Sequence, residues 1–246
     1  MKNQDRWVES KFVFRKGRLS ASFDPRELSV GSRLIATIVA KYYQDAFPVH
    51  ATGRLLDLGC GKVPFYAAYK AYVSEVLCVD WENSRHNNEY LDHEADLSQP
   101  LPFADGAFDT IILSDVLEHI PVPESLWAEM VRILSNRGKI IMNVPFYYRL
   151  HEQPHDYHRF TEFALRRLVA NSRMELIQIS AIGGAPEILA DILSKVATRI
   201  PKAGMPIAGA LQFLGLWFGK TRLGSRISAA TAAEFPFGYF MIAQKP

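Results

Sequence analysis

A turn that contains two glycines follows the first apolar run of the chain and is the strongest chemical signal in the sequence. Residues 55–61 read Leu-Leu-Asp-Leu-Gly-Cys-Gly. Glycine lacks a Cβ and tolerates positive φ, so the backbone of such a turn can approach a ligand closely. In an open α/β sheet the ligand crevice lies where a strand passes into the following helix. The turn therefore indicates a ligand loop at residues 59–61.

The same turn lacks one feature of a dinucleotide-binding loop. That loop needs a third glycine, and Pro64 stands at its position. A pyrophosphate packed on a helix N-terminus is therefore disfavoured. Lys62 is the one basic residue at the loop, and it is the point that favours a phosphate-containing ligand.

A second apolar run ends in a carboxylate. Residues 76–81 read Val-Leu-Cys-Val-Asp-Trp. An acidic residue at the end of the second strand can accept hydrogen bonds from ribose hydroxyls, and an aromatic ring can lie against a base. Alone, Asp80 could equally be a turn residue. Together with the glycine turn, Asp80 and Trp81 predict a nucleoside site.

Histidines gather in residues 145–161, after a later predicted strand. The string His151-Glu152-Gln153-Pro154-His155 has zinc-protease spacing, but that motif works on a helix, which Pro154 would break. No third ligand stands at a suitable spacing, so we expect no metal site. Histidine titrates near neutral pH and suits general-base catalysis. The candidate bases are His155 and His158, followed by His151 and His119.

The composition is that of an ordinary globular protein and excludes several classes of function. Of 246 residues, 48% are hydrophobic and 22% charged, and 28 Lys+Arg against 26 Asp+Glu give 28 − 26 = +2. This excludes a disordered or collagen-like chain and a strongly basic nucleic-acid binder. Two cysteines, Cys60 and Cys78, cannot form a disulfide framework, and residues 1–20 show no apolar signal segment. We therefore expect a cytoplasmic protein.

Short apolar runs alternate with helix-length segments from residue 48 onwards, which predicts βαβ units and a mainly parallel sheet covered on both faces. Strands are predicted at Arg54–Leu58, Val76–Val79, Phe108–Leu113, Lys139–Val144, Leu176–Ser180 and Tyr239–Ala243. Helices are predicted at Glu27–Phe47, started by Asp24 and Pro25, and at Phe65–Val73, Glu124–Leu134 and Glu162–Ala170. The last strand lacks a clear short crossover, so we expect it to insert antiparallel.

One connection is far longer than usual. Residues 183–236 separate the last two predicted strands, and residues 203–219 carry no charge. A membrane span is disfavoured because the stretch is short and contains Pro206 and several glycines. A buried or dimer-forming helix is the first interpretation. A lid over an apolar substrate, or a peripheral membrane anchor over residues 203–226 with basic side chains facing lipid phosphates, stays open.

A third motif follows the glycine turn and the strand that ends at Asp80. Ala95-Asp96-Leu97 precedes the run from Phe108 to His119, which ends Ser-Asp-Val-Leu-Glu-His. With the glycine turn and Asp80, the series resembles class I S-adenosylmethionine-dependent methyltransferases, in particular the type 11 family, over residues 52–182. The resemblance implies a Rossmann-like α/β fold: a mainly parallel seven-stranded sheet with an antiparallel last strand and helices on both faces. It also implies an N-terminal helical extension and a helical insert before the last strand.

The resemblance implies S-adenosylmethionine as the cofactor and a role for each matching residue. The loop residues Asp57, Gly59, Cys60 and Gly61 would hold the methionine part, with the Asp57 carboxylate near its ammonium. Asp80 would hold the ribose hydroxyls and Trp81 would flank the adenine. Asp96 would accept from the adenine amino group, the Leu97 backbone would meet the ring, and the Ser114 carbonyl would face the ammonium. Val63 stands where the family often has a small residue.

The charges agree with this cofactor, which carries a sulfonium and an ammonium. Asp57, Asp80 and Asp96 suit cations, whereas a dinucleotide brings phosphates that require basic groups. Residues 151–161 also resemble the His-Glu-x-Pro-x-Asp-Tyr-x-Arg-x-Thr stretch of type 11 relatives and would line the acceptor site. Alternatively, Thr161 simply caps the next helix and Arg159 pairs with Asp156.

We expect a single methyltransferase domain with an extension (1–50), a cofactor-binding core (51–182), an insert or lid (183–236) and a last strand (237–246). The predicted reaction is methyl transfer to a small-molecule, sugar or glycolipid acceptor, as O-methylation assisted by a His base. A quinone or lipid acceptor, a catalytically silent S-adenosylmethionine-binding module and, with less support, an NAD-dependent oxidoreductase are the alternatives. No nucleic-acid partner is expected. A homodimer and peripheral contact with the inner membrane face are left open.

Overall fold

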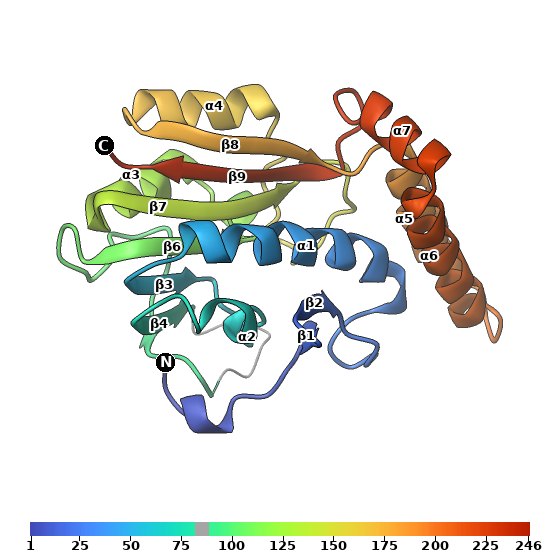
Figure 1. Cartoon of the computed structure of the whole chain (residues 1–246), viewed down its shortest axis with the longest axis horizontal. Helices are drawn as coiled ribbons and strands as arrows, with labels where there is room; N and C mark the ends of the chain where they lie inside the picture. Colours follow the sequence, from blue (N-terminus) through green and yellow to red (C-terminus); the bar gives the residue numbers. More distant parts are fainter. Residues whose placement is uncertain (82–88) are drawn as a thin grey trace.

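The computed structural model describes residues 1–81 and 89–246. Its main sheet has seven strands in the order β5-β4-β3-β6-β7-β9-β8, with helices on both faces (Figure 1). The strands are β3 Arg54–Leu58, β4 Glu75–Asp80, β5 His93–Glu94, β6 Phe108–Ser114, β7 Leu134–Pro145, β8 Glu175–Ile182 and β9 Gly238–Gln244. The expected Rossmann-like α/β fold is therefore confirmed.

The parallel part of the sheet brings the predicted motifs to one edge. β3 lies between β4 and β6 and runs parallel to both, with Leu58 opposite Val79 and Leu113. Because parallel strands end at a common edge, the turn after β3 lies beside Asp80 and Ser114. β9 pairs antiparallel with both β7 and β8, which confirms the predicted antiparallel insertion.

Each face of the sheet has its own apolar core. The covering helices are α1 Arg33–His50, α2 Tyr66–Tyr69, α3 Pro123–Ile133 and α4 Glu162–Asn171. Ile111 and Ile112 are both fully buried but lie in different cores, because successive strand side chains point to opposite faces. Ile112 shares its core with α1 and α2, and Ile111 shares the other with α3 and α4. Burial on both faces explains why the strands read as nearly continuous apolar runs.

The N-terminal extension contains a hairpin that we did not predict. After the 3-10 turn η1 (Gln4–Arg6), β1 (Phe12–Arg15) pairs with β2 (Arg18–Ala21). Lys16 and Gly17 between them have φ of 51° and 74°. Positive φ at both turn residues matches the twist of a two-residue hairpin. The hairpin lies beyond the carboxyl ends of the parallel strands, near the start of α1 (Figure 1).

Two helices differ from the prediction in length. The helix expected from Glu27 begins at Arg33, because residues 24–28 form a separate turn in which Leu28 donates to the Asp24 carbonyl, followed by the 3-10 turn η2 (Val30–Ser32). The helix expected over 65–73 is confined to α2. There the chain turns back toward β4, and the Ser74 amide donates to the Gly53 carbonyl at 2.8 Å.

The insert between β8 and β9 is helical, as expected. It forms α5 (Ala185–Ala197), α6 (Gly204–Lys220) and α7 (Arg222–Thr231), which stack at the end of the sheet where the parallel strands finish (Figure 1). The buried amide of Gln212 fixes this stack to the body of the protein. Its oxygen accepts from the Leu34 amide at 2.5 Å, and its nitrogen donates to the Ser194 hydroxyl at 2.6 Å. Among the described helices, none has the length and apolar character needed to cross a membrane.

Candidate functional site

A cavity of about 820 Å³ opens at the carboxyl edge of the parallel strands. Its volume lies within the range of small-molecule sites. All of the residues predicted to bind a cofactor line it: Asp57, Gly59, Cys60, Gly61, Asp80, Trp81, Asp96, Leu97 and Ser114. Residues of the N-terminal extension, including Lys11 and Leu28, complete the wall. The sheet edge and the extension therefore form one site.

The glycine turn is held against the neighbouring strand. The amides of Gly59 and Cys60 both donate to the Val79 carbonyl, at 2.8 and 3.1 Å. Gly59 has φ +66°, and a Cβ there would lie 2.4 Å from Cγ2 of Val116. Both the backbone conformation and the close approach require glycine. The turn thus presents bare backbone to the cavity, as the sequence predicts for a ligand loop.

Two carboxylates flank this turn in different environments. Asp57 at the end of β3 is buried, and burial raises its pKa to about 8 although the Tyr69 hydroxyl donates to it at 3.4 Å. Asp80 at the end of β4 accepts from the amides of Gly61 at 3.0 Å and Trp81 at 2.9 Å. The first carboxylate suits a cation, because a positive ligand would stabilise its charged form. The second is also buried and is oriented by backbone amides.

The part of the cavity around Trp81 is partly apolar. Trp81 is 37% exposed, and the ring of His155 meets it edge to face at 5.2 Å. Leu97 is buried in the lining, and Asp96 beside it accepts from the amide and hydroxyl of Ser98. An aromatic ring, an apolar side chain and a carboxylate together can bind a heterocycle with an amino group.

The basic residues that line the cavity are paired with carboxylates. Lys11 pairs with Asp115 at 3.1 Å, Arg26 with Asp24 at 2.6 Å, and Lys62 with Glu27 at 2.8 Å. Lys62 is the residue of the glycine loop whose charge favours a phosphate-containing ligand. Since Glu27 already accepts from it, the described lining suits a cationic ligand better than a pyrophosphate.

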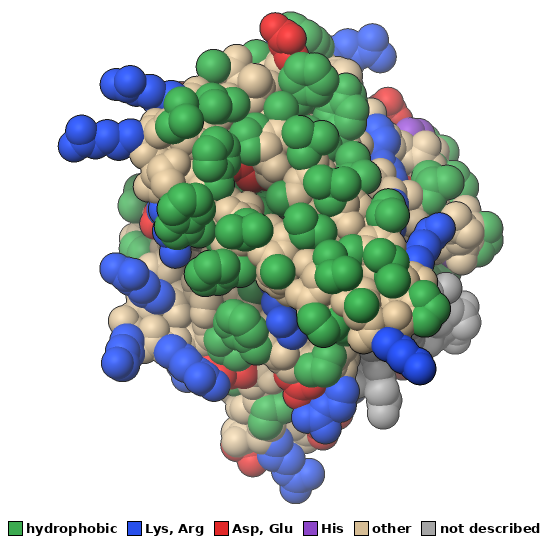
Figure 2. Space-filling view, turned by 90° about the vertical axis from the view of Figure 1, so that its right-hand side faces the viewer, with side chains coloured by type: hydrophobic (Ala, Val, Ile, Leu, Met, Phe, Trp, Pro, Cys, Tyr) green, Lys and Arg blue, Asp and Glu red, His purple; other side chains and the backbone are tan. Residues whose placement is uncertain are grey.

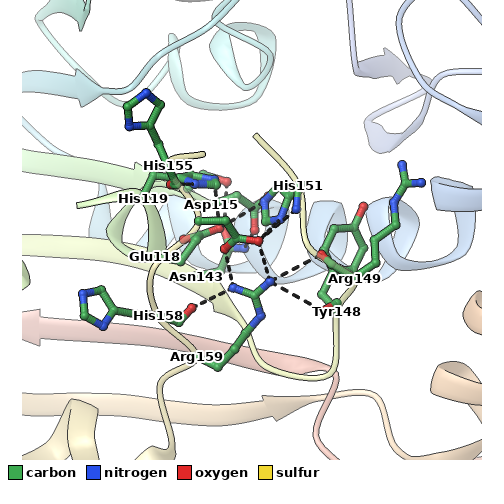
Figure 3. A network of polar contacts seen from close by, with 12 residues as sticks. Asp115, Glu118, His119, Asn143, Tyr148, Arg149, His151, His155, His158 and Arg159 are labelled. Atoms are coloured by element: carbon green, nitrogen blue, oxygen red, sulfur yellow. Dashed lines mark hydrogen bonds and ion pairs between the residues drawn. The ribbon is translucent and has the colours of Figure 1, made fainter. Parts of the chain in front are cut away.

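A buried acid lies beside the cavity, directly after β6 in the 3-10 turn η3 (Leu117–His119). Glu118 is fully buried, and among residues 1–81 and 89–246 no group donates a hydrogen bond to either of its carboxylate oxygens. The Nε2 atoms of His119 and His151 each lie 3.6 Å from its Oε1 (Figure 3). Burial raises the pKa of Glu118. Sequence reasoning did not identify this residue.

The loop that follows β7 is fixed by an ion pair. Arg159 donates to both oxygens of Asp156, at 2.5 and 2.8 Å, and Asp156 in turn accepts from the His151 amide at 2.9 Å. The Ala164 amide donates to the Thr161 hydroxyl at 3.2 Å. The structural interpretation of Arg159 and Thr161 is therefore confirmed. Residues 151–155 are not helical, which agrees with our exclusion of a zinc-protease motif.

The four candidate histidine bases fall into three groups. His119 and His151 line the cavity and face Glu118. His155 lines it near Trp81, with its Nδ1 3.1 Å from the Tyr157 hydroxyl. His158 lies outside the lining that the structure describes, with its Nε2 3.3 Å from the Pro121 carbonyl. Figure 3 shows the rings of His155 and His158 pointing away from Glu118.

A buried amide links the strand ends behind these histidines. Asn143 accepts at Oδ1 from the hydroxyls of Tyr43 and Ser114, both at 2.8 Å, and donates to Asp115 at 2.5 Å. We did not predict its part in the site. The sequence did contain a signal for it, an Asn inside the apolar run of β7. A buried polar side chain needs hydrogen-bond partners, so an Asn at this place indicates a polar network.

The comparisons with known proteins agree with this geometry. Residues 56–142 match the family model of the methyltransferase domain. An uncharacterized methyltransferase of Mycobacterium sp. (strain JLS) is 31% identical over 117 residues, which is 44% of this chain and 45% of the relative. The chain thus matches less than half the length of that relative. The resemblance to class I S-adenosylmethionine-dependent methyltransferases is confirmed, with S-adenosylmethionine as the cofactor of that family.

Solved structures extend the likeness in fold beyond this segment. An S-adenosylmethionine-dependent methyltransferase from Archaeoglobus fulgidus superposes with a TM-score of 0.54 at 16% identity, covering 88% of this chain and 93% of the other. One from Mesorhizobium loti gives 0.55 at 13% identity, covering 86% and 100%. The [4+2]-cyclase SpnF gives 0.56 at 15% identity, covering 97% and 87%. Because one fold hosts several reactions, the site has to carry the functional argument.

The residues of the cavity fit the cofactor of this family. Its ammonium and sulfonium are cations, and a cation would stabilise the charged form of the buried Asp57. Asp80 is held in the cavity lining by the Gly61 amide, where ribose hydroxyls could donate to it. Gly59 lines the cavity, and it is glycine because a Cβ there would clash with Val116. The three residues singled out in the sequence, Asp57, Gly59 and Asp80, thus line one cavity.

Proposed function

We propose that this chain, which carries a class I S-adenosylmethionine-dependent methyltransferase domain, transfers a methyl group to an oxygen of a small-molecule, sugar or glycolipid acceptor. The observation that carries the proposal is the acidic cavity around the glycine turn, in which the Lys and Arg residues of the described lining are already paired. When bound, S-adenosylmethionine supplies an activated methyl on a sulfonium. The protein then has to align the acceptor and exclude water.

Asp57 on β3 would anchor the methionine part of the cofactor, and Asp80 on β4 would anchor its ribose. Backbone hydrogen bonds fix the loop between them, so their spacing is set before binding. A preorganised site of this kind loses little conformational entropy when its ligand binds. Trp81, Asp96 and Leu97 would receive the adenine.

His155 is the base that we propose for an alcohol acceptor. It lines the cavity beside Trp81, and the contact of its Nδ1 with the Tyr157 hydroxyl orients the ring. His155 would take the proton that the acceptor loses while the new C–O bond forms and the C–S bond breaks, with the electron pair of that bond remaining on sulfur. His119 and His151 are less suited, because their Nε2 atoms face the buried Glu118.

The decisive experiment is detection of S-adenosylhomocysteine with a panel of sugar, glycolipid, lipid and quinone acceptors. With the active acceptor, His155→Ala should lower kcat about a hundredfold, as expected for loss of a general base. His93→Ala serves as the control, because His93 lies on β5 away from the cavity lining. An unchanged kcat in His155→Ala would show that His155 is not the base.

A lipid or quinone acceptor is the second candidate, and the surface of the insert favours it. Figure 2 shows hydrophobic side chains spread over this side of the molecule, with Lys and Arg side chains around them. Exposed apolar residues of the insert include Leu189, Leu193, Val196, Ile200, Phe213, Leu214 and Trp217. Exposed basic residues of the insert are Arg199, Lys202, Lys220, Arg222 and Arg226. Such a surface suits peripheral contact with an anionic membrane.

Two measurements separate this proposal from the remaining alternatives. Calorimetry with S-adenosylmethionine and with NAD distinguishes a methyltransferase from an oxidoreductase. Binding of S-adenosylmethionine without turnover on any acceptor of the panel would support a catalytically silent module.

A further inference from the structure

We propose that Glu118, His119 and His151 form a binding site for one divalent transition-metal ion in the wall of the cavity. The ligand set is two imidazoles and one carboxylate. The proposed metal site does not depend on the methyl-transfer reaction, because the argument for it uses only the positions of these three side chains. Their candidate ligand atoms all lie within 4.8 Å of one another.

The carboxylate of Glu118 is the first observation. It is fully buried, and both of its oxygens are without a hydrogen-bond donor among the described residues. A buried polar group without a partner is costly, and buried charges are normally paired or bound to a metal. The nearby Lys and Arg side chains are engaged elsewhere, since Lys11 pairs with Asp115 and Arg159 with Asp156, so in the part of the chain that the structure describes only the two histidines face Glu118. A bound cation would satisfy both oxygens.

The two imidazoles are the second observation. Each Nε2 lies 3.6 Å from the same oxygen of Glu118. Ligand atoms that bind one ion at about 2.1 Å stand roughly 3.0–3.4 Å apart. Since the ligand atoms lie within 4.8 Å of one another, side-chain rotations that move them by about 1 Å would bring all three onto one ion. In Figure 3 both rings lie beside Glu118.

One of the two outer ring nitrogens, that of His119, is already oriented in the manner of a metal ligand. Nδ1 of His119 lies 2.7 Å from the His155 carbonyl, so it carries the proton and Nε2 keeps a lone pair. Nδ1 of His151 lies 3.3 Å from Asp156 but makes no hydrogen bond with it, and Asp156 instead accepts from the His151 backbone amide. An outer carbonyl, as at His119, fixes the tautomer of a metal-binding histidine, and a small rotation of His151 would bring its Nδ1 into the same relation with Asp156.

The donor set indicates the class of ion. Imidazole with carboxylate suits Mn²⁺, Fe²⁺, Co²⁺, Ni²⁺ or Zn²⁺, whereas Mg²⁺ and Ca²⁺ prefer oxygen ligands. Since His119 and His151 both line the cavity, the remaining coordination positions would open toward a bound molecule with an oxygen donor. The site shares only His151 with the His-Glu-x-x-His string that we excluded from the sequence.

The test is a titration of the chelator-treated full chain with CoCl₂, followed by visible absorption. Wild type should bind about one equivalent with saturation, as a two-histidine, one-carboxylate site predicts. Glu118→Gln and His151→Ala should each weaken Co²⁺ binding more than about tenfold, and Asp156→Asn about tenfold through the orientation of His151. His93→Ala is the matched control and should bind as wild type, because its imidazole lies outside the site.

A structural loss is distinguished from a ligand loss by circular dichroism and thermal melting. Glu118→Gln keeps the side-chain volume and removes a buried charge, so its melting temperature without metal should equal or exceed that of wild type. If His151→Ala is misfolded, His119→Gln replaces it. Absence of saturable Co²⁺ binding to wild type, or unchanged binding in folded Glu118→Gln, would overturn the proposal. S-adenosylmethionine binding, measured on the same samples, reports separately on the proposed function.

Discussion

Lys62 of the glycine loop and Glu27 of the N-terminal extension form an ion pair, with Nζ 2.8 and 3.0 Å from the two carboxylate oxygens. The pair spans the cavity wall, because both residues belong to its lining. It neutralises the one basic residue of the loop. The extension therefore contributes to the charge of the cofactor site as well as to its shape.

Removal of Glu27 should weaken cofactor binding more than it weakens the fold. Both side chains are partly exposed, so the ion pair itself adds little to stability. Glu27→Gln would leave Lys62 positive beside a cationic ligand, and we expect the Kd for S-adenosylmethionine to rise about threefold at low salt. The double variant Glu27→Gln/Lys62→Gln should restore the affinity. Calorimetry measures both, and an unchanged Kd in the single variant would contradict the prediction.

Asp57 should make the stability of the ligand-free protein depend on pH. Burial raises its pKa from 3.8 to about 8, so the folded state binds more protons than the unfolded state between these values. The contribution of Asp57 to the free energy of unfolding is therefore retained at acid pH. It falls as pH rises toward 8, by at most about 1.4 kcal/mol per pH unit.

Asp57→Asn removes this titration. Without ligand, the variant should match wild type near pH 4 and be more stable near pH 8, which urea unfolding at a series of pH values can measure. The same variant should bind S-adenosylmethionine more weakly, because the buried negative charge is lost. A variant less stable than wild type near pH 8 would show that the carboxylate is not penalised by burial.

Gly59 allows a comparison between two glycines with the same backbone conformation. Gly59 and Gly106 both have φ +66°, but a Cβ at Gly59 would lie 2.4 Å from Val116, whereas at Gly106 the nearest atom lies at 3.8 Å. Gly106→Ala should cost about 1 kcal/mol of stability from the left-handed backbone alone. Gly59→Ala should cost more and should also reduce cofactor affinity at least tenfold. Equal effects of the two substitutions would contradict the close-approach argument.

The sequence predicted the parts of this protein that depend on local pattern. The strands from β3 to β9, apart from the two-residue β5, follow from apolar runs, and Asp57 and Asp80 follow from their places at strand ends. The Lys16-Gly17 hairpin was missed although its turn had a local signal, a two-residue loop ending in glycine. The contact of Glu118 with His151 was missed for another reason. The two residues lie on segments after different strands, and only the packing of the sheet brings them together.

The exposed face of the insert should bind anionic membranes. Phe213 and Trp217 on α6 are 67% and 57% exposed, and basic residues such as Lys202 and Lys220 lie at the two ends of that helix. Wild type should sediment with vesicles of phosphatidylglycerol and phosphatidylcholine, and less with phosphatidylcholine alone. Phe213→Ser/Trp217→Ser should reduce binding to the anionic vesicles about tenfold, because apolar area no longer enters the interface.

The control for this experiment is Phe163→Ser. Phe163 is 80% exposed but lies on α4, away from the insert, so its loss should leave vesicle binding unchanged. Size-exclusion chromatography of the same proteins tests whether a second copy of the chain binds this face instead of a membrane. A wild-type dimer that becomes monomeric in Phe213→Ser/Trp217→Ser, with no vesicle binding by wild type, would contradict the membrane proposal. In that case the apolar face of α6 would be a dimer interface, and the argument for a lipid acceptor would lose its support.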